Sequence, residues 1–258
     1  MNQNGVITEN AGRVCIIRID RPEVNNKLSI PCMKEIKRLL EEKAKDESCH
    51  SVILAGGDKF FCSGGELGDF RKMTPMEIKE FGAAFIELHT AMVKFPKPII
   101  GAVEGNAFGG GFSLVEACDL AVAAENALFA IPEILDGLAP AMGLSGIFAQ
   151  MPKKEVMALG LLGEKLTAAQ VLGYGMLNCV VPKECVIDRA MKLGRFFEDK
   201  SPTAVRLFKE LYDDMGFKDY ENRLHLGQSM MITLFKTNDG MEVLQSKDEN
   251  RKPVWSGK

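Results

Sequence analysis

Short apolar runs alternate with longer segments of helical periodicity along the first half of this 258-residue chain, and this alternation limits the fold more than any other feature. The runs 14–19, 51–55, 99–103 and 120–123 are rich in β-branched or small apolar residues and have the length of buried strands. Helical segments separate several of them, so successive strands have room to pair in parallel through crossover connections. The pattern predicts an α/β fold.

Capping residues mark two helix starts in this region. Ser29 stands before apolar residues spaced three and four apart, which predicts a helix that begins near it. Thr74, Pro75 and Glu77 combine an N-cap, a first-turn proline and a capping-box glutamate, so a second helix should run to about Val93. Both helices fall between predicted strands.

The second half of the chain has a different character. The strands largely stop by about Val181, and helix starts are marked by a capping-box pattern at 167–170 and by Ser201 before a proline. We therefore predict an α/β core over residues 1–195 and a helical region over residues 196–258, without a low-complexity linker between them.

The charge of the chain argues against two classes of partner. A net charge of −3 and a pI near 5.8 give no broad positive field of the kind that draws proteins to nucleic acid or anionic lipid. The apolar stretches are far too short to span a bilayer, and the first residues lack the basic and apolar parts of a secretion signal. We expect neither nucleic acid nor a membrane as a partner.

The cysteines and histidines suggest neither disulfides nor a metal site. Seven cysteines are scattered without a C-x-x-C pair, which indicates reduced thiols and a cytoplasmic protein. The three histidines, His50, His89 and His225, lie too far apart in sequence to form a metal-ligand motif. No protein-bound metal is expected.

Two glycine-rich segments, 62–67 and 109–113, are the best candidates for a ligand site. Glycine lets a ligand approach the backbone closely, and amides at a helix start have no partner within the helix. Such amides can bind phosphate, but neither segment matches the dinucleotide-binding or P-loop pattern. A glycine triplet is also common at a tight strand-to-helix junction, so each segment alone decides little.

Both segments belong to a series of motifs whose order resembles that of the crotonase, or enoyl-CoA hydratase/isomerase, superfamily over nearly the whole chain. Each motif is weak by itself, but the joint order is specific. The motifs in this sequence are RPEVNNKL (21–28), FCSGGEL (61–67), KPIIGAVEG (97–105), FGGG (108–111), CDLA (118–121), PEI (132–134) and the stretch from TAA (167–169) to VVP (180–182).

The resemblance implies a crotonase-like spiral of ββα turns and a homotrimer or dimer of trimers, with the helical C-terminal part involved in trimerisation. It also implies an acyl-coenzyme A thioester as substrate, with no separate cofactor. Gly65 and Gly110 match the two residues whose backbone amides form the family's oxyanion hole, which stabilises a thioester enolate. The positions that line the coenzyme A path correspond to Lys27, Leu28, Ser63, Glu66 and Leu67.

The catalytic side chains depart from the usual family pattern. Hydratases of the family usually carry two glutamates; Glu133 matches the second, whereas Ser113 stands where the first is expected. A serine is not a base at neutral pH, but its hydroxyl can hold a water molecule or a polar group of the substrate. This arrangement resembles the hydroxycinnamoyl-CoA hydratase-lyase branch, and delta-3 to delta-2 enoyl-CoA isomerases likewise often use that single glutamate.

Two further acids are candidates for a second proton-transfer group. Asp136 lies three residues after Glu133, and if both carboxylates face the acyl pocket, one of them should have a raised proton affinity; a turn residue before Gly137 is the alternative. Glu116 lies three residues after Ser113 and shares its face of the helix. The alternative for Glu116 is a surface or interface salt bridge.

Enoyl-CoA hydratase activity is the expectation, with Glu133, Ser113 and Asp136 as the catalytic residues. The alternatives are an isomerase that uses Glu133 alone, a hydratase-lyase, a decarboxylase or thioester hydrolase, and a non-catalytic acyl-CoA-binding scaffold. Cys62 and His89 are interpreted as packed residues. Arg251, Lys252 and Trp255 are candidates for contact with a neighbouring subunit or coenzyme A, and the residues expected to line an apolar acyl pocket are Phe70, Met73, Phe81, Phe85, Met142 and Phe148.

Overall fold

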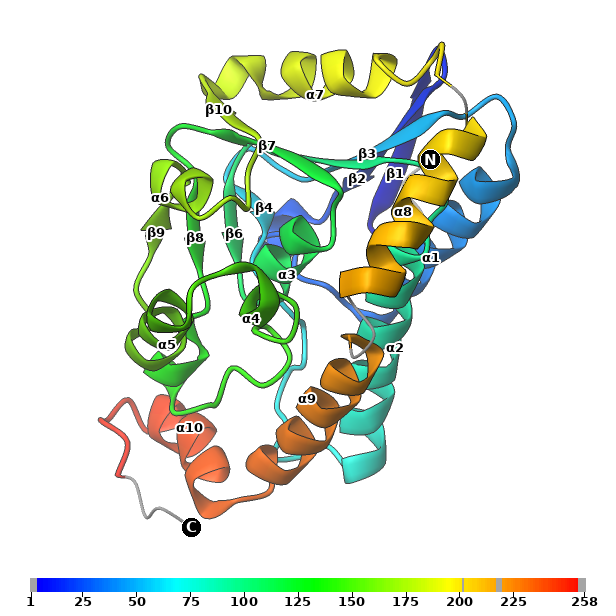
Figure 1. Ribbon diagram of the computed structural model, residues 1–258. Helices are drawn as coiled ribbons and strands as arrows, with labels where there is room; N and C mark the ends of the chain where they lie inside the picture. Colours follow the sequence, from blue (N-terminus) through cyan, green and yellow to red (C-terminus); the bar gives the residue numbers. More distant parts are fainter. Residues whose placement is uncertain (1–3, 201, 217–219, 255–258) are drawn as a thin grey trace.

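A computed structural model describes residues 4–200, 202–216 and 220–254 of the chain (Figure 1). Two sheets and a set of helices make up this part of the molecule. The larger sheet has six strands, which in spatial order are β1 (Val6–Ala11), β2 (Val14–Ile19), β3 (Ser51–Ala55), β5 (Ile99–Val103), β7 (Leu120–Ala124) and β10 (Cys179–Val181).

All pairs of the larger sheet are parallel except β1 with β2, which form an antiparallel hairpin. The strands β3 and β5 are buried at every residue, which is why they appear in the sequence as continuous apolar runs. The predicted bounds of β2, β3 and β5 agree with the structure, and β7 is one residue longer than predicted.

A second, smaller sheet was not predicted. Its strands, in spatial order, are β4 (Phe60–Cys62), β6 (Asn106–Phe108), β8 (Leu128–Ala130) and β9 (Leu166–Thr167). The first three run parallel to one another, and β9 is antiparallel to β8. With two or three residues each, these strands are too short to show a periodicity, so only their pairing defines them.

The chain alternates between the two sheets as it advances. It passes from β3 to β4, from β5 to β6 and from β7 to β8, and a helix or 3-10 helix follows each pair. This is the spiral of ββα turns that the resemblance implies. As a result, the three segments that follow β4, β6 and β8 leave neighbouring parallel strands at the same edge of the small sheet.

The helices surround these sheets, with α3 in the middle of the molecule beside β6 and β4 (Figure 1). Phe112 of α3 packs against Phe129 of β8 with ring centroids 5.1 Å apart, and both side chains are fully buried. The helices are α1 (Ile30–Lys45), α2 (Pro75–Val93), α3 (Gly110–Glu116), α4 (Ile147–Gln150), α5 (Lys153–Leu162), α6 (Ala168–Gly173), α7 (Val186–Arg195), α8 (Pro202–Gly216), α9 (Tyr220–Phe235) and α10 (Asn238–Asp248), with 3-10 helices η1 (Pro22–Val24), η2 (Pro132–Asp136) and η3 (Lys183–Cys185).

The predicted caps are confirmed. The Ser29 hydroxyl accepts a hydrogen bond from Cys32 N at the start of α1. Thr74 and Glu77 form a reciprocal capping box on α2, and a second such box begins α6 at Thr167. Because each box satisfies two otherwise unpaired amides, these helix starts are fixed locally by the sequence. Ser201, the third predicted start, lies outside the described residues.

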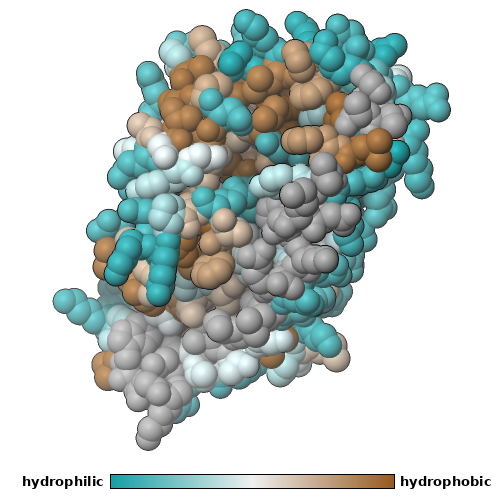
Figure 2. All heavy atoms as spheres, in the orientation of Figure 1, coloured by the Kyte–Doolittle hydropathy of each residue, from teal (hydrophilic) through white to brown (hydrophobic). Residues whose placement is uncertain are grey.

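The described elements that follow α7 are all helices, as the sequence predicts for residues 196–258. An ion pair of 2.6 Å between Lys209 of α8 and Asp119, the residue before β7, anchors α8 to the core. Apolar side chains gather on the upper part of the face shown in Figure 2, and exposed residues of this C-terminal region include Phe196, Leu207, Phe208 and Tyr212. No helix in the described part of the chain is long and apolar enough to cross a membrane.

Candidate active site

The predicted site residues come together where β4, β6 and β8 end. Gly65 follows β4, Gly110 follows β6 and Glu133 follows β8. Because these three strands are parallel neighbours, their carboxyl ends bring segments that are far apart in sequence to one place. The fold therefore places the two glycine segments and the glutamate at the same edge of the small sheet.

A single parallel bridge connects Leu28 to the first glycine segment. Leu28 N donates to Gly64 O at 2.8 Å, and Glu66 N donates to Leu28 O at 2.9 Å. In a parallel bridge these two bonds use the groups that flank the opposite residue, so the N–H of Gly65 itself points away from Leu28. No acceptor among the described residues takes a hydrogen bond from Gly65 N.

The second glycine segment lies directly beside the first. A Cβ atom added to Gly64 would be 3.7 Å from Gly110 N and 3.9 Å from the Cα of Gly109. Gly109 has φ +52° and ψ −123°, a conformation that residues with a Cβ atom rarely adopt. Only glycine therefore suits the turn that brings the two segments together.

The peptide group between Gly109 and Gly110 has a fixed direction. The Gly109 carbonyl accepts hydrogen bonds from Phe112 N at 3.0 Å and from Ser113 N at 3.2 Å. Because a trans peptide holds its C=O and N–H on opposite sides, the Gly110 N–H must point away from these bonds. It has no acceptor within the described residues, so both glycine segments present an unpaired backbone donor.

The Glu133 carboxylate lies against two glycines. Its Oε1 would be 2.9 Å from a Cβ atom on Gly109 and 3.4 Å from one on Gly143. Its Oε2 is buried and has no hydrogen-bond partner in the described structure. A buried carboxylate oxygen without a partner is costly, so its presence next to unpaired amides indicates a functional group rather than a packing residue.

The environment of Glu133 changes its protonation. Burial raises the pKa of the carboxyl group to about 7, the hydrogen bond from its own backbone N–H opposes this change, and the negative charge of Asp136 adds to it. A carboxyl group with a pKa near neutrality can both accept and return a proton at physiological pH.

The chain as a whole matches one known family. The sequence pattern described as enoyl-CoA hydratase/isomerase matches residues 9–258. The chain belongs to this family. A probable mitochondrial enoyl-CoA hydratase of Dictyostelium discoideum is 30% identical over 252 residues, which are 97% of this chain and 90% of that protein.

Two further relatives cover nearly all of the chain. A carnitinyl-CoA dehydratase of Salmonella enteritidis is 29% identical over 263 residues, with 100% of both chains covered. The crystal structure of a carnitinyl-CoA hydratase from Mycobacterium avium superposes with a TM-score of 0.85 and 32% identity, covering 99% of this chain and 100% of that one. Sequence and fold thus agree on membership of the enoyl-CoA hydratase/isomerase family.

Ser113 occupies the family position at which a glutamate was expected, and its hydroxyl is engaged by the protein. The side chain is 3% exposed, its Oγ donates to Gly143 O at 2.8 Å, and the Gly109 carbonyl oxygen lies 3.4 Å away. The hydroxyl proton is therefore committed to the backbone, which leaves the oxygen lone pairs for any further partner.

Asp136 is bound to the C-terminal helix α10. Its carboxylate forms an ion pair of 2.7 Å with Lys247 of α10, and both side chains are about half exposed. Asp136 still lies close enough to raise the pKa of Glu133. Of the two acids, Glu133 is therefore buried and Asp136 is half exposed, and Asp136 acts on Glu133 through its charge.

The residues expected along the coenzyme A path lie on two adjacent stretches. Leu28 is buried, whereas Lys27 is exposed and its carbonyl accepts a bond from Arg21. Glu66 forms an ion pair of 2.7 Å with Arg21, and Leu67 packs against the core. The Ser63 hydroxyl is buried without a partner in the described structure, so it is available to a ligand.

The alternative of a surface charge is wrong for Glu116. The residue is 6% exposed, and its Oε1 accepts a bond of 2.7 Å from Gln150 Nε2. The Tyr220 hydroxyl lies 3.4 Å from its Oε2. This carboxylate therefore connects α3 to α4 and α9.

His89 and Cys62 are core residues, as the sequence predicted. His89 is fully buried and stacks on Phe85 with ring centroids 3.9 Å apart, and burial lowers its pKa to about 4. Burial raises the pKa of Cys62 to about 12. A neutral imidazole and a protonated thiol remove both residues from acid-base and nucleophilic roles near neutral pH.

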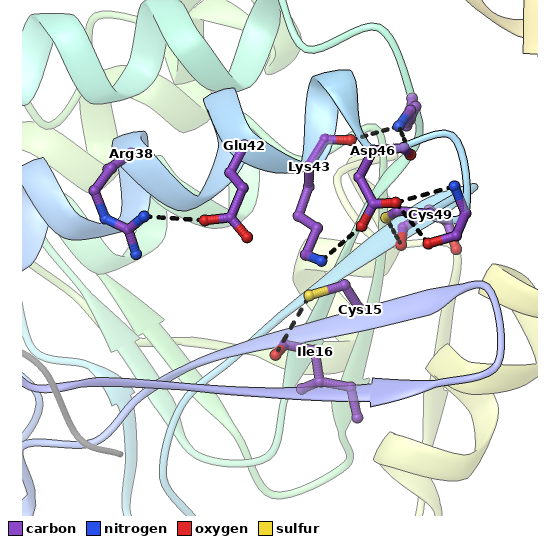
Figure 3. A network of polar contacts seen from close by, with 10 residues as sticks. Cys15, Ile16, Arg38, Glu42, Lys43, Asp46 and Cys49 are labelled. Carbon is purple, nitrogen blue, oxygen red and sulfur yellow. Dashed lines mark hydrogen bonds and ion pairs between the residues drawn. The ribbon is translucent and has the colours of Figure 1, made fainter.

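A separate polar cluster closes the end of α1 (Figure 3). Lys43 and Asp46 form an ion pair of 2.8 Å, and the thiols of Cys15 and Cys49 lie nearby with their hydrogens directed to backbone carbonyls. Burial raises the pKa of Cys15 to about 11 and also raises that of Cys49. The cluster has a structural role, since neither thiol forms a thiolate readily.

The residues expected to line an acyl pocket are mostly inside the molecule. Phe70, Phe81, Phe85 and Met142 are buried, Met73 is partly buried against the core, and Phe148 is 63% exposed. That these residues line an acyl pocket stays a prediction. Among the C-terminal candidates, Arg251 pairs with Glu242 and Glu249 and Lys252 is exposed. Trp255 lies outside the described residues.

Sequence reasoning gave no individual role to three residues that shape the site. Gly143 leaves room for Glu133, and Gly109, rather than its neighbours in the triplet, adopts the strained turn. Asn26 is 2% exposed, and its Nδ2 donates to Phe60 O at 2.9 Å, which ties the loop before Leu28 to β4. The Asn-Asn pair at 25–26 was a usable signal, because asparagine tolerates the positive φ found at both positions.

Proposed function

We propose that this protein catalyses the reversible addition of water to an enoyl-CoA thioester. The observation that carries the proposal is the meeting of a buried, partnerless Glu133 oxygen with two glycine segments whose backbone N–H groups have no acceptor in the described structure. Membership of the enoyl-CoA hydratase/isomerase family supports the same reaction.

Gly65 and Gly110 are proposed to hold the thioester oxygen. In hydration the oxygen of water bonds to the β carbon of the acyl group, and the electron pair of the double bond moves through the α carbon onto the thioester oxygen. Preorganised donors stabilise that oxygen as it becomes negative, and loss of one donor typically lowers the rate by about 10² to 10³.

Glu133 is proposed to carry the proton. Its carboxylate takes a proton from the attacking water and returns it to the α carbon, so that one group acts first as base and then as acid. A pKa of about 7 suits both steps, because neither direction of transfer is then strongly uphill. Asp136 contributes through its charge, and no metal or redox cofactor is needed.

The coenzyme A part is proposed to lie along the two stretches joined by the Leu28–Gly65 bridge. Lys27 is exposed at the outer end, Glu66 and Leu67 flank Gly65, and the Ser63 hydroxyl offers an unused polar group. This arrangement directs the thioester toward the two N–H groups. A cytoplasmic location belongs to the same proposal, on the sequence grounds given above.

An isomerase that moves a double bond is the second candidate. It is favoured by the commitment of the Ser113 proton to Gly143, which leaves Glu133 as the acid-base group. In that reaction Glu133 removes a proton from one carbon and returns it to another, and no water is added. The two candidates differ in the mass of the product.

The decisive experiment is mass spectrometry of 2-enoyl-, 3-enoyl- and malonyl-type CoA thioesters incubated with the protein in deuterated water, with Glu133→Gln as the control. Hydration predicts that a 2-enoyl thioester gains the mass of heavy water, and that Glu133→Gln lowers this rate by about 10² to 10⁴. Double-bond movement without added water would assign an isomerase instead. Binding without any turnover, unaffected by Glu133→Gln, would leave an acyl-CoA-binding role.

The oligomeric state is proposed to be a homotrimer or a dimer of trimers. Exposed Phe196, Phe208 and Tyr212 lie in the C-terminal region, and the last two line a cavity of about 780 Å³ between the end of α3 and α8. Such apolar exposure is uncommon on a monomer. Light scattering of the wild type and of Phe208→Glu tests this, and a monomeric wild type would contradict it.

A further inference from the structure

The Ser113 hydroxyl contacts both glycines that surround the Glu133 carboxylate. Ser113 Oγ donates to Gly143 O at 2.8 Å and lies 3.4 Å from Gly109 O. Gly109 and Gly143 are also the two residues at which an added Cβ atom would meet Glu133 Oε1, at 2.9 and 3.4 Å. The buried Ser113 hydroxyl thus contacts the two backbone segments, at Gly109 and Gly143, that lie against the Glu133 carboxylate.

The same hydroxyl contacts the donor peptide. The carbonyl of Gly109 and the N–H of Gly110 belong to one planar unit, so a group that holds the carbonyl also sets the direction of the N–H. Gly109 O already accepts bonds from Phe112 N and Ser113 N, and the hydroxyl approaches it from the side of the Gly143 segment. A rotation of this peptide would therefore disturb contacts in both segments.

We propose that Ser113 is a positioning residue that holds the Gly143 segment against the Gly109–Gly110 peptide and thereby sets the distance between Glu133 and the Gly110 N–H. In this role the serine acts through the Gly143 carbonyl, to which its proton is given, and not through a contact with the reacting water. The inference rests on the proposed function for its kinetic readout, but the contact itself can be tested without substrate.

The test compares Ser113→Ala with Ser51→Ala. Ser51 is a fully buried serine of β3 whose hydroxyl donates to Gly194 O at 3.1 Å, so its loss is chemically matched and lies in the larger sheet. For each variant, hydration of a 2-enoyl thioester and deuterium exchange at the α carbon of the saturated thioester are measured in parallel. Thermal melting shows how much folded protein each sample contains.

A positioning role predicts that the hydration rate and the α-carbon exchange rate fall together in Ser113→Ala, by roughly ten- to a hundredfold. Both reactions need Glu133 at the correct distance from the thioester whose carbonyl is polarised. Ser51→Ala should stay within about threefold of the wild type, since a lost buried hydrogen bond far from the reacting atoms affects stability only. A fall in hydration alone, with α-carbon exchange unchanged, would show that Ser113 holds the water and would overturn the inference. Unchanged rates would overturn it as well.

The pH profile separates positioning from simple loss of folded protein. The charged groups near Glu133 in the described structure are Asp136 on its own 3-10 helix and, paired with Asp136, Lys247 of α10. Ser113→Ala leaves both in place. If the Gly143 segment loosens, water reaches the Glu133 carboxylate and the midpoint of the pH-rate profile moves to lower pH. A smaller amount of active protein would not move the midpoint, and an unmoved midpoint contradicts the proposal.

Amide hydrogen exchange gives a readout without substrate. Peptides that cover residues 105–117 and 138–148 should exchange faster in Ser113→Ala and at the wild-type rate in Ser51→Ala. If the wild type turns over no thioester, the proposed function fails, whereas this exchange still decides whether Ser113 joins the two segments. Equal exchange in all three proteins would overturn the inference.

Discussion

Lys247 Nζ lies 2.7 Å from Asp136 Oδ1, so the C-terminal helix α10 is connected by charge to the 3-10 helix that carries Glu133. The adjacent Asp248 pairs with Arg71 at 2.5 Å, in the segment that follows Gly65. Two consecutive residues of α10 therefore contact both of the segments that border the site. A change of charge in α10 should therefore change the pKa of Glu133.

Asp136→Asn removes the negative charge that helps to raise the pKa of Glu133. The pKa of Glu133 should fall, and the midpoint of the pH-rate profile should move to lower pH, while the maximal rate changes little. Lys247→Gln should move the midpoint in the opposite direction, because Asp136 then lacks its counter-charge. The measurement is kcat/KM between pH 5 and 9 for each variant and for the double variant.

In the double variant Asp136→Asn/Lys247→Gln, the effect of Lys247 should disappear, since it acts through Asp136. Added salt should weaken both shifts, because the pair is half exposed. Identical pH-rate profiles for the wild type and Asp136→Asn would show that Asp136 takes no part in the reaction.

Glu133→Gln should change how stability depends on pH. The pKa of Glu133 is raised by folding from 4.5 to about 7, so its contribution to stability is complete below pH 4.5 and is lost as the pH rises through 7. The free energy of unfolding of the wild type should therefore fall relative to the variant over this window, by at most about 3 kcal/mol. Urea denaturation at pH 5 and pH 8 measures the difference, and a parallel pH dependence of the two proteins would contradict the burial of this carboxyl group.

Gly109→Ala should disturb both the backbone of the turn and the position of the Glu133 carboxylate. Its φ of +52° is unfavourable for alanine, and the added Cβ atom would be 2.9 Å from Glu133 Oε1. We expect a loss of about 1–3 kcal/mol in stability and at least a hundredfold in rate. Gly173→Ala in α6 is the matched control, because no atom lies within 4 Å of its added Cβ. It should leave the rate unchanged and raise stability by up to about 1 kcal/mol.

Gly65→Ala tests how closely α2 packs on the first glycine segment. The new Cβ atom would be 2.7 Å from Phe81 Cζ, so either the ring or the segment that carries the Gly65 N–H must move. We expect roughly a tenfold loss of kcat/KM, measured by steady-state kinetics. Phe81→Leu removes the colliding atoms, and the double variant should recover most of the loss. Simple additivity of the two changes would show that the ring is not the obstacle.

Much of the larger sheet was predictable because burial on both faces makes its strands continuous apolar runs. The bounds of β2, β3 and β5 follow from that pattern, and the capping boxes at Thr74 and Thr167 locate two helix starts within one residue. The strands of the small sheet were not predictable, since three residues carry no period and only their partners stabilise them. Strand β1 was missed because only its first residue, Val6, is buried, and the residues in its middle are polar and exposed.

The candidate site was predictable in part. The glycine-rich segments and Glu133 were found by their motifs, and the fold brings them together at one edge of the small sheet. The direction of Asp136 was not predictable, because it depends on Lys247, which lies far away in the sequence and joins it only in the folded chain. The bond from Ser113 to Gly143 likewise depends on tertiary structure, as do the contacts of Glu116 with Gln150.

The unpaired N–H groups of Gly65 and Gly110 belong to the main chain, and this has a consequence for how such a protein diversifies. Point mutation can replace the surrounding side chains one at a time, yet every non-proline residue still carries an amide hydrogen. In the proposed function, the capacity to stabilise a negative carbonyl oxygen therefore belongs to the main chain, and exchange of a nearby side chain leaves both donors in place. Exchange of the serine at position 113 should therefore change how the donors are positioned without removing either of them.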